Sequence, residues 1–147
     1  MSKVLTFIAL SGGCVVPIFM DLGSSHLFNE LWDAHARSHL VWMIASFFLI
    51  FILGSYFLFI EKNEVIPALL SLCVLLGYAI SALTINIYGG VFLGEGGVEP
   101  EPFGIPINLI HFSSMLFLQL LAFILILNRN TQRSVSYTHL TLPTIYS

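Results

Sequence analysis

Residues Leu40–Ile60 read LVWMIASFFLIFILGSYFLFI, a run without a single Asp, Glu, Lys or Arg. A helix needs roughly 20 mostly apolar residues to cross the hydrocarbon core of a bilayer, and this run is long enough. Three further runs are also free of these charged residues and about as long: Val4–Met20, Val65–Tyr88 and Ile107–Leu127. The sequence therefore predicts an all-α fold, a four-helix transmembrane bundle.

The composition of the whole chain agrees with a membrane protein. Of its 147 residues 57% are hydrophobic and only 9% are charged, whereas a soluble domain is roughly 25% charged. The formal net charge is -3, and the five Lys and Arg residues are spread along the chain. Nucleic acid is therefore excluded as a partner, and the lipid bilayer is the partner that we expect.

The positions of the basic residues predict how the bundle is oriented. Lys3, Lys62, Arg129 and Arg133 fall on one side of the predicted membrane, and Arg37 falls alone on the other. Short segments rich in Lys and Arg stay on the cytoplasmic side. Both ends of the bundle are therefore predicted to be cytoplasmic, in the cytoplasmic membrane of a bacterium.

Two segments near the ends of the chain have alternative interpretations. Lys3 and the apolar run after it resemble a signal peptide, and Ser11-Gly12-Gly13-Cys14 approaches a lipoprotein cleavage site. The apolar run continues beyond Cys14, which favours a retained helix. Residues 134–147, SVSYTHLTLPTIYS, show no apolar period, and from Val135 they resemble a translated sequencing adapter.

We therefore take residues 1–133 as one four-helix domain and 134–147 as a non-native tail. If this resemblance holds, natural sequence after about Arg133 is missing. A short natural cytoplasmic tail is the alternative.

Histidines gather on the predicted exoplasmic side of the bundle. His35 and His39 have the i,i+4 spacing that brings two side chains together if the second helix begins a turn early. His26 lies in the loop between the first two spans, His111 lies one turn inside the fourth span, and Asp21 directly follows the first span. Imidazole and carboxylate groups suit a transition metal, so these five residues are our candidate ligands for zinc, iron or copper. A structural role at the interface, or acid and base catalysis without metal, are the alternatives.

Three further residues of the first loop are candidate substrate contacts. Arg37 could hold an anionic group through two hydrogen bonds, or it could pair with Asp33 or a lipid phosphate. Asn29 and Trp32 lie in the same loop and are assigned to the same contact.

Small and polar residues recur at helical spacing within Val65–Tyr88. They are Gly77, Ser81, Thr84 and Tyr88. Small residues let membrane helices approach closely, so we interpret the stripe as helix packing, with a substrate path as the alternative.

The first loop carries a family resemblance. Residues His26–His39 read HLFNELWDAHARSH, which resembles the H-x-x-N-x-x-W-x-x-H-A-R-x-H signature of small four-helix membrane proteins without an established activity. Glu30 and Asp33 depart from it, since proline is common at those places. The resemblance implies the fold and topology and no chemistry. A weaker similarity is to the copper-binding helices of membrane monooxygenase subunits, although Asp21 precedes His26 by one position too many.

Together these features predict a membrane protein with a histidine-rich exoplasmic metal site. In the enzymatic version a metal-bound hydroxide attacks a lipid-like substrate. The alternative is a non-catalytic subunit or sensor whose first loop binds a partner protein, in a homo- or hetero-oligomer. Whether the protein is an enzyme is left open.

Overall fold

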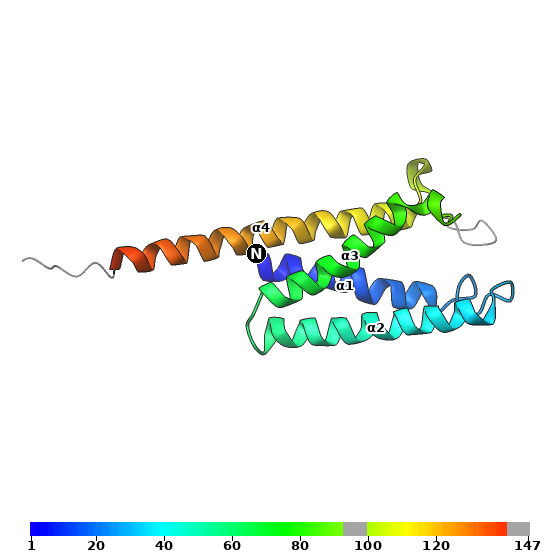
Figure 1. Cartoon of the computed structure of the whole chain (residues 1–147), viewed down its shortest axis with the longest axis horizontal. Helices are drawn as coiled ribbons and strands as arrows, with labels where there is room; N and C mark the ends of the chain where they lie inside the picture. Colours follow the sequence, from blue (N-terminus) through cyan, green and yellow to red (C-terminus); the bar gives the residue numbers. More distant parts are fainter. Residues whose placement is uncertain (93–99, 141–147) are drawn as a thin grey trace, which may run out of the picture.

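The computed structural model describes residues 1–92 and 100–140, with side chains of the last helix up to Gln132. Within these ranges the chain is helical and has no strand (Figure 1). The long helices are α1 (Ser2–Asp21), α2 (Ala34–Phe59), α3 (Val65–Leu83) and α4 (Ile107–Leu140), and the short 3-10 turns are η1 (Ile85–Ile87) and η2 (Pro102–Gly104). All four long helices are long and apolar enough to cross a membrane. The predicted all-α fold with four membrane-length helices is confirmed.

The helix ends differ from the predicted spans for local reasons. Helix α2 begins at Ala34, before the predicted Leu40, because the Asp33 carboxylate accepts a hydrogen bond from the His35 backbone N–H at 2.7 Å and so caps the helix. Helix α3 ends at Leu83, and the prediction that it reaches Tyr88 is wrong. The residues after Leu83 are Thr, Ile, Asn and Ile, which are weak helix formers, and the chain enters η1 there.

The last helix is longer than predicted. The predicted end at Leu127 marked the end of the apolar run, whereas α4 continues to Leu140. Its final turns include residues 134–140 of the segment that resembles an adapter, and residues 141–147 lie outside the described part of the chain.

Helices α1 and α3 hold the bundle together, because each of them contacts the other three long helices. The core centres on Leu10, Cys14 and Val74, with Phe47, Ile50 and Phe51 packed against them. Gly12 allows α1 to approach α4, because a Cβ there would lie 2.3 Å from the Met115 sulfur. Small residues at helix contacts are typical of membrane bundles.

The outer faces of the helices are apolar as well. On α2, for example, Phe48, Leu49, Ile52 and Leu53 are all exposed. Large contiguous apolar surfaces are rare on soluble monomers, and in this chain they are compatible with contact to a lipid bilayer.

Two ends of the bundle can be distinguished. At the Glu64 end, α1 begins, the turn of residues 60–64 joins α2 to α3, and α4 passes by. At the histidine end, α1 and α3 end, α2 and α4 begin, and residues 22–33 form the first loop. Figure 1 shows α3 inclined away from α2 toward the histidine end.

Polar contacts tie three elements together at the Glu64 end. The Ser2 hydroxyl donates to Glu64 Oε2 at 2.6 Å, and Arg129 Nη2 lies 3.0 Å from Glu64 Oε1. Partial burial alone would raise the pKa of the Glu64 carboxyl. The hydrogen bonds from Ser2 and Arg129 and the positive charges of Arg129 and the N-terminus outweigh it, so the pKa lies below its ordinary value of 4.5.

This ion pair predicts a pH dependence of stability. Because the pKa of Glu64 is lower in the folded chain than in the unfolded chain, its contribution is present above about pH 4.5 and is lost as the pH falls through the folded value. We expect Glu64→Gln to lower the free energy of unfolding by about 1 kcal/mol at neutral pH and by less in acid. Thermal unfolding in detergent at neutral and at acidic pH measures this difference. Glu30→Gln, at an exposed residue, is the control. An equal loss at both pH values would contradict the assignment.

Candidate functional site

The first loop is held in shape by Asn29 and Arg37. Asn29 is buried, its Nδ2 donates to the Ser25 carbonyl at 3.3 Å, and its Oδ1 accepts from the Leu31 backbone N–H at 2.9 Å. Arg37 Nη2 donates to the Asn29 carbonyl at 2.8 Å. Both residues were predicted to contact substrate. In the structure the Asn29 side chain bonds within the first loop and the Arg37 guanidinium ties that loop to α2, and neither residue lines the two cavities described below.

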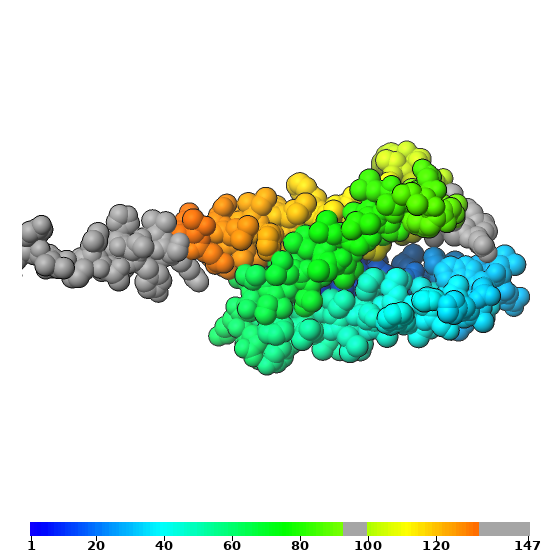
Figure 2. All heavy atoms as spheres, viewed as in Figure 1, coloured from blue at the N-terminus to red at the C-terminus, as the bar shows by residue number. Residues whose placement is uncertain are grey.

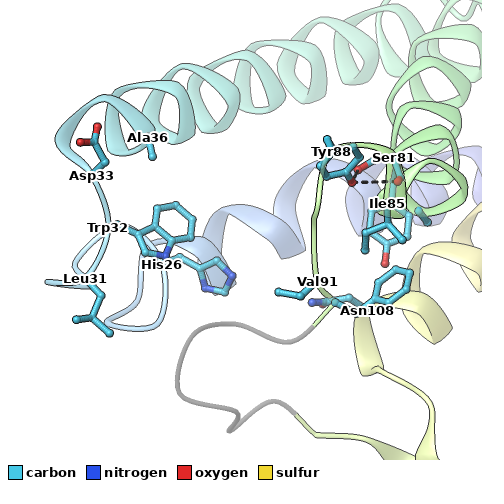
Figure 3. Close-up of a pocket in the computed structure, with 13 residues that line it drawn as sticks. His26, Leu31, Trp32, Asp33, Ala36, Ser81, Ile85, Tyr88, Val91 and Asn108 are labelled. Atoms are coloured by element: carbon cyan, nitrogen blue, oxygen red, sulfur yellow. Dashed lines mark hydrogen bonds between the residues drawn. The ribbon is translucent and has the colours of Figure 1, made fainter.

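A cavity of about 550 Å³, here called the loop cavity, lies between the first loop and the end of α3. Figure 3 shows His26 and Trp32 on one side of it and Ser81, Tyr88 and Asn108 on the other. The His26 and Trp32 rings meet edge to face, with centroids 5.7 Å apart. Tyr88 is fixed by a 2.7 Å hydrogen bond between its hydroxyl and that of Ser81. The rest of the lining consists of Leu31, Asp33, Ala36, Tyr78, Ala82, Ile85, Val91 and Phe92.

A second cavity of about 670 Å³, here called the helix cavity, lies among all four helices. Figure 2 shows the surface hollowed between α2 and α3 toward the histidine end, with atoms of α1 at its floor. The lining is mostly apolar and comprises Val16, Pro17, Met20, Met43, Phe47, Ile50, Cys73, Val74, Gly77, Ile107 and Phe112, with Asp21, Tyr78, Ser81, Asn108 and His111 as its polar members.

The two cavities adjoin each other. Tyr78, Ser81 and Asn108 line both of them. The Tyr78 ring stacks on Phe112 of α4 with centroids 3.9 Å apart, which braces α3 against α4 at this boundary. The two adjoining cavities are together called the cleft, which has a polar, aromatic part under the first loop and an apolar part among the helices.

The five candidate metal ligands lie in three places. His35 and His39 form the predicted i,i+4 pair, are both exposed, and have their Nε2 atoms 3.0 Å apart. His26 Nε2 lies 3.9 Å from Asp21 Oδ1. His111 Nε2 donates to the Gly12 carbonyl at 2.9 Å, which ties α4 to α1. Among the described residues no group of three or more His, Cys, Asp or Glu could hold a metal ion.

Side-chain direction explains this separation. The two histidines of α2 project outward from its first turns, whereas His111 is directed between α4 and α1. The spacing of residues along the chain predicts the pair within α2, but it does not predict how the separate helices are rotated toward each other.

Sequence reasoning missed part of the cleft. Tyr78 and Phe112 lie within apolar runs and gave no signal. Gly77, Ser81 and Tyr88 were noted as a stripe and interpreted as helix packing, whereas they line the cavities. Thr84, the fourth member of that stripe, lines neither cavity.

Comparison with protein-family models, with curated proteins and with solved structures gave no match to this chain. The residues of the site are therefore the basis for its function.

Proposed function

We propose that this chain is an integral membrane protein that binds a lipid-like amphiphile in the cleft. The observation that carries the proposal is that Tyr78, Ser81 and Asn108 belong to both cavities. Ligand sites in proteins are concave and mostly apolar, with a few polar groups that fix orientation. An amphiphile would place its chain in the helix cavity and its head group in the loop cavity, beside His26 and Trp32.

The distribution of charge supports an orientation for this membrane protein. Lys3, Lys62 and Arg129 lie at the Glu64 end, and Arg37 lies at the histidine end. We propose that the Glu64 end is cytoplasmic and that the cleft opens on the exoplasmic side of a bacterial cytoplasmic membrane.

Tryptophan fluorescence tests the binding of an amphiphile. The chain has two Trp residues, and Trp42 is 70% exposed on the outer face of α2, where any detergent would reach it. In a Trp42→Phe protein the remaining Trp32 reports on the loop cavity. We expect a single-chain amphiphile brominated close to its head group to quench the Trp32 fluorescence. The quenching should saturate while the amphiphile is still a minor fraction of the detergent in the micelle. Quenching that rises in proportion to the share of brominated amphiphile in the micelle, without saturating, would refute the proposal.

A metal-dependent reaction at the exposed His35–His39 pair, which lies outside both cavities, is a second candidate. Nitrogen ligands at about 2.0–2.1 Å from one ion lie roughly 2.8–3.0 Å apart when they are cis at a right angle. The two Nε2 atoms lie at a hydrogen-bond distance of 3.0 Å, so the pair could close on a copper ion without a large movement, with iron and zinc as alternatives. Water bound to such an ion would have a pKa near neutrality and could act as a nucleophile.

Metal content checks this second candidate. We expect purified protein to take up about one Cu²⁺ per pair of imidazoles, to lose it in a His35→Ala/His39→Ala double variant, and to keep it in His26→Ala. Elemental analysis after removal of free metal gives the ratio. Uptake that survives the double variant would contradict the assignment, as would no uptake by the wild-type protein.

A non-catalytic subunit is the candidate from another class. Phe28, on the first loop, is 66% exposed and lines neither cavity, so it could contact a partner protein. A partner that co-purifies and is lost in Phe28→Ser, while amphiphile still quenches Trp32, would favour this role.

A further inference from the structure

The cleft has no Lys or Arg among its described residues, and its basic side chains there are the imidazoles of His26 and His111. Lys3, Lys62 and Arg129 are at the opposite end of the bundle, and the guanidinium of Arg37 donates to the Asn29 carbonyl. An anionic head group that left water for this cleft would therefore meet no opposite charge, which is costly.

Negative charge and aromatic rings are present instead. Asp33, whose carboxylate caps α2, lines the loop cavity, and Asp21, whose carboxylate lies 3.9 Å from His26 Nε2, lines the helix cavity. Four aromatic side chains, Trp32, Tyr78, Tyr88 and Phe92, line the loop cavity. The faces of such rings attract cations. The helix dipoles do not offset the negative potential of the two carboxylates, because two helices begin and two end at the histidine end, so that their opposite dipole ends meet there.

We infer that the cleft selects amphiphiles whose head group is cationic, an amine or a quaternary ammonium, over anionic ones. This inference rests on the proposed function and adds the class of ligand. A cationic head group would lie among the aromatic rings of the loop cavity, within the field of the two carboxylates. Its chain would occupy the apolar part of the cleft.

Competition among dodecyl amphiphiles tests the selection. Dodecyltrimethylammonium, dodecyl maltoside and laurate carry the same chain with a cationic, neutral or anionic head. Each is titrated against the brominated amphiphile in the Trp42→Phe protein, at about pH 8, above the ordinary range of histidine. We expect the cation to displace the brominated probe at a concentration about tenfold lower than laurate does, with the maltoside between them.

Neutralising substitutions identify the source of the preference. Asp33→Asn removes the charge and keeps the helix cap, since Asn caps about as well as Asp. Combined with Asp21→Asn it should remove most of the difference between the cation and laurate. Glu30→Gln makes the same change of charge on an exposed residue of the same loop that lines neither cavity, and it should leave the preference intact.

The outcomes separate the two proposals. Equal displacement by all three heads would overturn the charge selection and leave amphiphile binding in place. A preference unchanged in the double Asp variant would overturn the assignment of that selection to the two carboxylates. If no probe quenches or displaces, the proposed function itself fails.

Discussion

Gly77→Leu is expected to abolish the saturable quenching of Trp32 by the brominated amphiphile and to leave the bundle at least as stable. Gly77 lies on α3 and lines the helix cavity, and a Cβ built there meets no heavy atom within 4 Å. The leucine side chain therefore has room in the cavity and occupies the space proposed for the ligand chain. Replacing glycine within a helix also gains up to about 1 kcal/mol.

The control for this variant adds bulk elsewhere. Ala45→Leu enlarges an exposed position of α2 that lines neither cavity, and it should leave quenching unchanged. Thermal unfolding of both variants in the same detergent excludes a loss of fold. Full quenching in a folded Gly77→Leu protein would show that the amphiphile does not occupy the helix cavity.

Gly12→Val is expected to destabilise the bundle by about 2–3 kcal/mol. A Cβ at this position would lie 2.3 Å from the sulfur and 2.7 Å from the Cγ of Met115, and 3.5 Å from His111 Cε1. The added methyl groups would push α1 away from α4 and strain the hydrogen bond from His111 to the Gly12 carbonyl. Denaturant-induced unfolding in mixed micelles measures the loss.

A rescue variant shows whether the contact with Met115 is responsible. Met115→Ala makes room for the new side chain, so the Gly12→Val/Met115→Ala double variant should be less destabilised than the sum of its single variants. Strict additivity would mean that the cost of Gly12→Val arises elsewhere.

The sequence was sufficient to predict the four helices, because each is an uninterrupted apolar run about as long as the bilayer core is thick. It was less informative about where they end. The start of α2 depends on the cap by Asp33, and the end of α3 depends on a local run of weak helix formers. Neither the cap by Asp33 nor the run of weak helix formers changes the hydropathy of the apolar runs from which the helices were predicted.

The site was harder to predict than the fold. The spacing of His35 and His39 predicts their contact, since both lie within one helix. Arg37 and Asn29 carry polar groups that suit a substrate, but the Arg37 guanidinium donates to the Asn29 backbone carbonyl and the Asn29 side chain bonds within the loop, and only the path of the first loop reveals this. The cleft itself depends on the inclination of α3 and on the stacking of Tyr78 on Phe112, which are contacts between elements far apart in the sequence.

Photolabelling tests the central claim, that an amphiphile occupies the cleft. A single-chain amphiphile with a diazirine at the end of its chain is bound to the protein in detergent and irradiated, and the labelled residues are mapped by mass spectrometry. We predict labels on Phe47 and Cys73, which line the helix cavity, and their loss in Gly77→Leu. Equal labelling of Leu49 and Ile52, which lie exposed on α2 outside the cavity, would contradict the account.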